Sequence, residues 1–514
     1  MSSPQLLVNA IGFGKFQIVL MLVCGLTYMA DAMEIMLISY LTVVLQTAWS
    51  LDTVAQATLA STVFAGELVG AFAWGMFGDY FGRRWSFFLS CLIVAAAGLA
   101  SAFAVEFKLL VGMRALVGFG VAGIAVPFDL LMEFLPDRER GRMLSVYQYF
   151  WSLGSIFATV AAWLFLPRLD IDLGWRFYVG ACSIPLWLAL LAVPCMPESP
   201  EWLLSRGRAE EAKAVLAWMA RVNGASVVEL QLSGLSASAA DGESMEPYGD
   251  SQQSGTSPQK LCAYGYRRTT FVLWLIYAAF GFTYYGAIMI FHQIFTEAMA
   301  HNDNGGNTTS LVDPPIGGNG TLPDVPTFDY VGDLIAASSE FVGTTLLILL
   351  IEPLGRVHSQ VAFYAVGGFG LILLYWQEAP YWVTITAAFL ARGSLLASSN
   401  AAWVLTPELY PTEIRATGHQ FATAANRLCA FATQYVAVGL SVRYVTVVYG
   451  SVALVAALAP LALPNEQRIE LRRSETSKLW PRRGSSILMQ RLDSLPPDFG
   501  GSRAASLLNP LGFG

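Results

Sequence analysis

The ten residues GMFGDYFGRR, from Gly75 to Arg84, join two apolar stretches that are each long enough to cross a lipid bilayer. Stretches of this kind recur along the chain. Six of them start near Phe16, Ala57, Trp85, Leu109, Met143 and Trp175, and six more near Thr270, Val331, Ser359, Tyr381, Arg415 and Ser441. The sequence therefore predicts an all-α membrane protein with twelve transmembrane helices in two pseudo-symmetric six-helix halves.

The composition agrees with this interpretation. Of the 514 residues, 55% are hydrophobic and 13% are charged, and the mean hydropathy is +0.52. In soluble domains roughly a quarter of all residues are charged, so this chain has too few charged residues for a water-exposed surface. A net charge of −7 without a separate basic domain argues against nucleic-acid binding. No nucleophile elbow, zinc triad, P-loop or C-x-x-C pair occurs, and we expect neither an enzyme nor a cofactor or metal.

The pattern divides the chain into five segments. We expect a cytosolic N-terminus (1–15), a first six-helix half (16–196), a polar linker (197–269), a second half (270–464) and a polar tail (465–514). The linker begins with an amphipathic helix-forming stretch, Arg208 to Ala220, and is rich in Ser and Gly after Asn223. Such a composition cannot bury a core, so we expect most of the linker, like the tail, to be disordered.

Charge sets the predicted orientation. With the N-terminus in the cytosol, the cytosolic segments hold 23 of the 30 Lys and Arg residues, so both termini are predicted to be cytosolic. The loop from Thr296 to Tyr330 has no Lys or Arg and contains two N-x-T sequons, at Asn307 and Asn319. Sequons are modified only on the lumenal or outer side, so we expect glycosylation there. This topology suits the plasma membrane and the membrane of an intracellular vesicle equally.

The two halves also repeat in sequence. Asp79, Gly82 and Arg83 reappear as Glu352, Gly355 and Arg356, an offset of 273. Other pairs recur at nearly the same distance: Glu133 and Arg140 as Glu408 and Arg415 (offset 275), and Arg114 as Arg392 (offset 278). Two six-helix halves related by a parallel repeat are typical of one secondary-transporter architecture.

These motifs carry a family resemblance. The pattern G-x-x-x-D-x-x-G-R-R of Gly75 to Arg84 resembles the signature loop of the major facilitator superfamily, and RALVGFGVAG (114–123) and PESPEWL (197–203) resemble further motifs of its sugar-porter members. MADAME (29–34), MEFLP (132–136) and TPELYPTEIRATG (406–418) are similar to the synaptic-vesicle-protein-related branch, near the organic-ion and nicotinate-type transporters. The resemblance covers Phe13 to Pro464 and implies the major facilitator fold.

Residues at the cytosolic ends of the helices are candidates for gating. Asp79 can accept hydrogen bonds from backbone amides and arginines and so hold the halves together, and the glycines permit sharp turns and close helix approach. Arg83 and Arg84 have a second interpretation, as charges that only set topology. The gating set is Gly75, Asp79, Gly82, Arg83, Arg84, Glu133, Arg140, Glu352, Gly355, Arg356, Glu408 and Arg415.

Placing an ionisable side chain at bilayer depth costs at least ~2.5 kcal/mol, so such residues are usually retained for a function. The ionisable residues within the spans are therefore candidates for proton coupling. Asp31 and Glu34 are three apart and share a helix face. The resemblance implies more. Glu34 stands five residues before Ser39, as in proton-coupled sugar porters, and Arg114 matches the fourth-span arginine that pairs with that carboxylate. A static ion pair that only holds the bundle together is the alternative.

Other polar and aromatic residues of the spans are candidates for substrate binding, with helix packing as the alternative. They are Glu67, Asp129, Tyr147, Gln148, Tyr284, Tyr285, Arg392, Asn400 and Arg427. Glu67 and Asp129 depart from the relatives, which tend to have uncharged residues there.

Taken together, these features favour a monomeric secondary active transporter. It would move a small organic, ionic solute by rocking its two halves, with H⁺ as the coupling ion. A non-transporting receptor or vesicle scaffold on the same fold is the alternative, although a scaffold has little reason to retain charges inside its spans.

Overall fold

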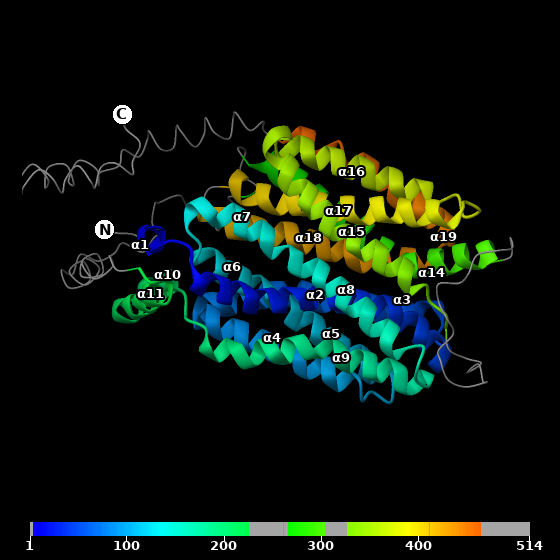
Figure 1. The fold of residues 1–514 in the computed structure, drawn as a ribbon, viewed down its shortest axis with the longest axis horizontal. Helices are drawn as coiled ribbons and strands as arrows, with labels where there is room; N and C mark the ends of the chain where they lie inside the picture. The colour runs from blue at the N-terminus through cyan, green and yellow to red at the C-terminus, as the bar shows by residue number, and fades with distance from the viewer. Residues whose placement is uncertain (1–3, 226–260, 262–265, 304–325, 411, 464–514) are drawn as a thin grey trace, which may run out of the picture. The chain divides into compact units, whose positions relative to one another are not determined.

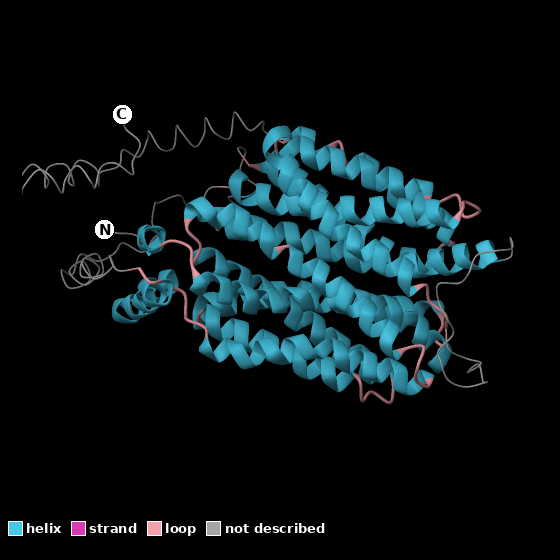
Figure 2. Ribbon diagram, viewed as in Figure 1, coloured by secondary structure: helices cyan, strands magenta, loops and turns pink. Residues whose placement is uncertain are grey.

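A computed structural model describes residues 4–225, 261, 266–303, 326–410 and 412–463, apart from a few side chains within these ranges. The described residues are helical and contain no strand (Figure 2). Two series of long helical segments run alongside one another (Figure 1). The first series comprises α2 (Lys15–Trp49), α3 (Thr53–Phe81), α4 (Arg83–Ser101), α5 (Phe107–Val121) continuing into α6 (Ala125–Glu133), α7 (Asp137–Tyr147) followed by α8 (Tyr149–Phe165), and α9 (Ile171–Ala192).

The second series begins after the linker. It comprises α14 (Arg267–Asp303), α15 (Tyr330–Leu354), α16 (Arg356–Leu373), α17 (Tyr381–Leu409), α18 (Thr412–Gly439) and α19 (Val442–Ala456). We call the two series the first half and the second half. Across the boundary between them, α3 packs against α18 and α8 packs against α15.

Eight helices of the described residues are long and apolar enough to cross a membrane. They are Lys15–Trp49, Thr53–Gly78, Arg83–Ser101, Phe107–Glu133, Ile171–Cys195, Arg267–Met299, Tyr330–Leu354 and Val442–Ala462. The other four expected spans are the helices α8, α16, α17 and α18. Of these, α17 and α18 carry several polar side chains, including Asn400 and Arg427, that face a cavity described below.

The polarity of the bundle is the reverse of that of a soluble protein. Large apolar side chains such as Leu191 (76% exposed) and Leu349 (64% exposed) lie on its outside, whereas Arg114 and Glu340 are fully buried. Apolar surface of this kind is stable against lipid but not against water. The structure is therefore that of an integral, multi-pass membrane protein.

Glycines allow the closest helix contacts in the first half. A Cβ atom at Gly66 would collide with the carbonyl oxygen of Ala115, and one at Gly70 with that of Phe119, so α3 and α5 touch backbone to backbone. This four-residue spacing of small residues is the usual device for close helix packing in membranes.

Three short helices gather at one end of the bundle, which we call the linker end (left in Figure 1). They are α1 (Pro4–Ile11), α10 (Pro200–Ser205) and α11 (Ala209–Asn223). The last of these docks on the start of α2, because the Asn223 side chain accepts a hydrogen bond from the backbone N–H of Phe16 (3.0 Å) and the Trp218 ring packs edge-on against that of Phe16. The opposite end holds the last turn of α14 and the first turn of α15.

Candidate functional site: a charged cavity between the halves

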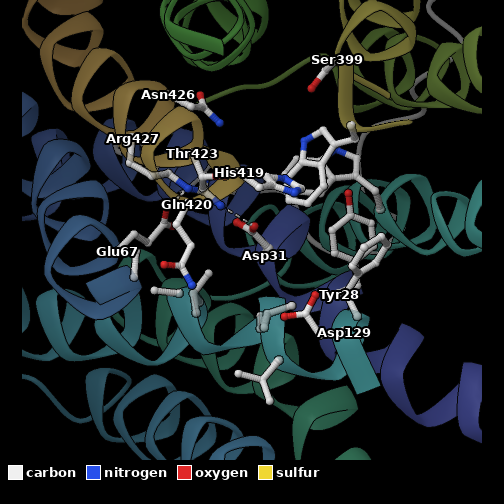
Figure 3. Close-up of a pocket in the computed structure, with 18 of the residues that line it drawn as sticks. Tyr28, Asp31, Glu67, Asp129, Ser399, His419, Gln420, Thr423, Asn426 and Arg427 are labelled. Carbon is white, nitrogen blue, oxygen red and sulfur yellow. Dashed lines mark hydrogen bonds and ion pairs between the residues drawn. The ribbon is translucent and has the colours of Figure 1, made fainter. Parts of the chain in front are cut away.

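A cavity of about 190 Å³ lies between the two halves (Figure 3). Its walls come from α2 to α8 of the first half and from α14, α17 and α18 of the second. Many of its lining side chains are aromatic: Tyr28, Trp74, Phe128, Tyr147, Trp151, Phe280, Tyr285 and Trp403. A mostly apolar pocket with a few polar groups is typical of small-molecule sites.

The polar centre of the cavity is an ionic triad that joins the halves. Arg427 Nη2 of α18 donates to Asp31 Oδ2 of α2 at 2.8 Å, and Arg427 Nε lies 2.7 Å from Glu67 Oε2 of α3. All three side chains are largely buried. Arg427 Nη1 also donates to the Tyr285 hydroxyl at 3.0 Å. One guanidinium therefore faces two carboxylates from the opposite half.

The remaining predicted substrate residues divide into two groups. Asp129, Tyr147, Gln148 and Asn400 line the cavity together with the triad and Tyr285. Tyr28, which the sequence interpretation passed over, donates its hydroxyl proton to Gln148 Oε1 at 2.7 Å. Tyr284 and Arg392 are not among the lining residues. They belong to a buried network behind the wall.

That network is centred on Glu340 of α15, which the sequence analysis did not single out. Its Oε1 accepts hydrogen bonds from Arg392 Nε and from the Tyr284 hydroxyl, both at 2.7 Å. The Tyr284 oxygen in turn accepts from Trp151 Nε1 of the first half at 2.8 Å. A chain of hydrogen bonds thus connects the cavity wall at Trp151 to the buried ion pair.

The candidate proton-coupling residues separate in space. Arg114 Nη1 donates to both oxygens of Glu34, at 2.7 and 3.0 Å, and Arg114 Nη2 donates to Ser101 Oγ. This pair lies among α2, α4, α5 and α9, inside the first half. Asp31, one turn before Glu34, instead turns to the cavity and Arg427. The pair implied by the resemblance is therefore present, but apart from the triad.

At the end opposite the linker, polar contacts close the bundle. Tyr40 donates to Asp333 Oδ2 at 2.6 Å, and Ser39 Oγ donates to the carbonyl oxygen of Ile288 at 3.1 Å. Ser39 Oγ also lies 3.2 Å from His292 Nδ1. In contrast, two residues that line the cavity, Arg83 and Asp129, lie near the linker end. The cavity therefore extends from the triad towards the linker end.

The Gly75–Arg84 loop has a partner that the sequence did not indicate. Glu198 Oε1, from the PESPEWL segment, accepts the backbone N–H groups of Arg83 (2.8 Å) and Arg84 (3.2 Å), where α4 begins. A carboxylate at a helix N-terminus satisfies unpaired amides and the helix dipole. We expected Asp79 to accept such bonds, and its side chain lies outside the described residues.

The other gating candidates are found at the same end. Glu133 lies 3.9 Å from Arg83 and accepts a hydrogen bond from Ser199 Oγ, and Arg140 lies 3.2 Å from Asp137. All three contacts lie at the linker end of the first half. Arg84 donates to the Pro194 carbonyl oxygen.

The two halves share a backbone feature at this position. Gly82 has φ of +98° and Gly355 has φ of +79°, and each precedes the first residue of a helix, α4 or α16. Positive φ angles of this size favour glycine. The second half therefore repeats the turn of the first half, together with its glycine, at an offset of 273 residues. Glu352 is exposed, and Arg356 opens α16.

Several candidates fall where the structure gives no side chain or no backbone. Asp79 lies in α3, Glu408 in α17 and Arg415 in α18, but their side chains are outside the described residues, and of Gly75 only its place in α3 is described. The sequons at Asn307 and Asn319, most of the linker after Ala225 and the tail from Pro464 are also outside them.

Two halves of six helical segments around a charged central cavity define a membrane transporter of the major facilitator type. Residues 23–460 match the family model described as "Sugar (and other) transporter". The chain therefore belongs to the sugar (and other) transporter family of the major facilitator superfamily, whose members carry small solutes and are not enzymes.

Individual relatives support the same assignment. The chain is 32% identical to a putative transporter, svop-1, of Caenorhabditis elegans, over 90% of this chain and 85% of that one. It is 30% identical to organic cation/carnitine transporter 7 of Arabidopsis thaliana (84% and 87% covered) and 31% identical to the synaptic vesicle 2-related protein of Xenopus laevis (90% and 80%).

A solved structure confirms the fold. The xylose transporter XylE from E. coli, in a partially occluded inward-open conformation, superimposes with a TM-score of 0.66 at 19% identity, covering 88% of this chain and 100% of that one. The predicted major facilitator fold is therefore correct.

Proposed function

We propose that the protein carries a small organic cation across the membrane by alternating access, with H⁺ as the coupling ion. The observation that supports a cation is the charge of the cavity wall. Three carboxylates line it, those of Asp31, Glu67 and Asp129, and two arginines, Arg83 and Arg427. The charge of Arg83 is already partly balanced by Glu133, which lies beside it. Aromatic faces attract cations as well. The name of the Arabidopsis relative, organic cation/carnitine transporter 7, points in the same direction.

The orientation of the chain decides which way the cavity faces. We propose cytosolic termini and a cytosolic linker, as the distribution of Lys and Arg predicts, and outer glycosylation at Asn307 and Asn319. The linker end is then cytosolic, and the described conformation has its cavity on the cytosolic side. The protein is proposed to work as a monomer, because a single chain supplies both walls of the cavity.

Proton coupling is proposed to involve Glu34 and Arg114. Contact with the guanidinium stabilises the ionised carboxylate, whereas a dry site without that contact favours the protonated acid. A movement that made and broke the contact would bind and release one proton per cycle. Asp31 is the second candidate, because the triad that holds it spans the two halves.

Uptake into proteoliposomes tests both parts of the proposal. The panel contains matched pairs of equal size, each an arylalkylammonium and the corresponding carboxylate, with a neutral sugar as a further compound. We expect accumulation of the ammonium members only, driven by a pH gradient. Preference for the carboxylates would contradict the cation, and no uptake of any compound would favour a scaffold.

The variant Glu34→Gln separates coupling from binding. It keeps the shape of the side chain and cannot titrate. We expect pH-driven accumulation to disappear while exchange of labelled for unlabelled cation persists. Accumulation with an unchanged pH profile would exclude Glu34 as the coupling site. Glu106→Gln, at the start of α5 and exposed, is the matched control.

A further inference from the structure

The triad has an unequal stoichiometry. One guanidinium, that of Arg427, faces the carboxylates of Asp31 and Glu67 at 2.8 and 2.7 Å. Both carboxylates come from the first half and the guanidinium comes from the second, as the dashed contact in Figure 3 illustrates for Asp31. With both carboxylates ionised, the triad is a net anionic site that already contains one cation of the protein itself.

The two carboxylates have hydrogen-bonding capacity that Arg427 does not use. Asp31 Oδ1 and Glu67 Oε1 are buried and accept no hydrogen bond from the described residues. An ionised carboxylate offers about four acceptor sites, and a buried acceptor without a donor is unfavourable. Both residues line the cavity, so a ligand in the cavity can supply the missing donors.

The surroundings also suit a cation. The Arg427 guanidinium carbon lies 5.7 Å from the centre of the Tyr285 ring, and Tyr285 stacks obliquely on Phe64 at 5.1 Å. Elsewhere around the cavity, Trp151, Trp403 and Tyr28 are further aromatic lining residues. A site already built to hold one guanidinium has the geometry to hold another.

We propose that Arg427 is a tethered cation that occupies the Asp31–Glu67 carboxylates in the empty carrier, and that a cationic substrate displaces it. This inference rests on the proposed function in one respect, namely that the transported solute is a cation. The preferred solute carries N–H donors, as a guanidinium or a primary ammonium does, because the carboxylate oxygens need donors. A quaternary ammonium supplies none.

The tether has a consequence for transport. When the substrate leaves, Arg427 returns to the carboxylates, so the empty carrier can reorient without two unpaired buried charges. Without Arg427, the negative charges of Asp31 and Glu67 are balanced only when a cationic substrate is bound. Net uptake should then fail while exchange of one cation for another continues.

Binding of ethylguanidinium, which resembles the end of an arginine side chain, tests the displacement. The variants are Arg427→Ala, which vacates the site, and Arg427→Gln, which keeps most of the volume if the alanine variant does not fold. Quenching of the fluorescence of the cavity tryptophans reports binding to the purified full-length chain. We expect each variant to bind at least ~10-fold more tightly than the wild type, because the internal competitor is gone.

Two further variants make the test specific. Adding Asp31→Asn to Arg427→Gln should abolish the gain, because one of the two carboxylates is lost. Arg443→Gln, which removes a partly exposed arginine 4.0 Å from Glu378, should bind as the wild type does. Equal affinity of the wild type and both Arg427 variants would overturn the proposal.

Transport of labelled ethylguanidinium completes the test. Wild-type proteoliposomes should show both net uptake and exchange, whereas Arg427→Gln should show exchange alone. Net uptake by Arg427→Gln at the wild-type rate would overturn the role of the tether. If the variants bind more tightly but the wild type carries neither ethylguanidinium nor any cation of the panel, the tethered cation stands and the proposed transport function fails.

Discussion

The substitution Glu340→Gln should destabilise the protein far more than the same substitution at a surface ion pair. The carboxylate of Glu340 is fully buried and lies 2.7 Å from Arg392 Nε, whose side chain is 1% exposed. Glutamine keeps the shape and can still accept the hydrogen bond of Tyr284. It leaves the guanidinium buried without a counter-charge, however, and breaking a buried pair in this way costs about 3–5 kcal/mol.

A matched control lies in the same half. Arg443 and Glu378 are 4.0 Å apart with side chains 42% and 71% exposed, so solvent screens the pair. Such pairs contribute about 0–1 kcal/mol, and Glu378→Gln should be nearly neutral. Removing both buried charges, in Glu340→Gln with Arg392→Gln, should recover much of the lost stability, because neither residue is then an unpaired ion.

Thermal unfolding of the purified protein in lipid nanodiscs measures the difference. A folding unit of 150–250 residues, about the size of one half, shifts its Tm by roughly 2–4 °C per kcal/mol. Glu340→Gln should therefore lower the Tm by roughly 6–20 °C, and Glu378→Gln by less than ~4 °C. All variants are heated at one rate, because membrane proteins often unfold irreversibly. Equal shifts for the two single variants, or a double variant no more stable than Glu340→Gln, would refute the reasoning.

Three other outcomes are expected. Glu198→Gln should weaken the start of α4 by ~1 kcal/mol, because an amide caps helix N–H groups less well than a carboxylate. Its Tm should be lower than that of the exposed control Glu378→Gln, and equal Tm values would contradict the cap. Gly355→Ala should cost ~1–3 kcal/mol because φ is +79°, whereas Gly112→Ala, in an exposed part of α5, should be neutral or stabilising. Enzymatic deglycosylation should shift the electrophoretic mobility of the wild type made in a eukaryotic host. It should not shift that of the variant with Asn307→Gln and Asn319→Gln, and protease access to the Thr296 to Tyr330 loop from the cytosol would contradict the topology.

The sequence was sufficient for the fold and for the charged residues of the cavity wall. Long apolar stretches fix the spans, and the structure has helices starting within a few residues of nearly every predicted position. Polar residues inside those stretches had to face one another or a cavity, since lipid cannot solvate them. Asp31, Glu67 and Arg427 are such residues, and all three line the cavity.

Partners across the two halves could not be predicted. Asp31 and Glu34 share a helix face by spacing, yet Asp31 contacts Arg427 while Glu34 contacts Arg114. The choice depends on how the halves pack, and no local pattern encodes that. Glu340 was missed although a signal existed, since it follows Glu67 by the same offset of 273 that relates Gly82 to Gly355.

The location of the ion pairs bears on the mechanism of coupling. Glu34 with Arg114, and Glu340 with Arg392, each lie inside one half, so rocking of rigid halves separates neither pair. The contact of Arg427 with Asp31 and Glu67 crosses the boundary between the halves. In the proposed cycle it persists while the empty carrier rocks, and a bound cation takes the place of Arg427 at the two carboxylates. If Glu34→Gln loses pH-driven accumulation, α2 must move against α5 within the first half, and that half is not rigid. If Asp31→Asn loses it while Glu34→Gln retains it, the proton is bound and released at the triad between the halves, and the first half can remain rigid.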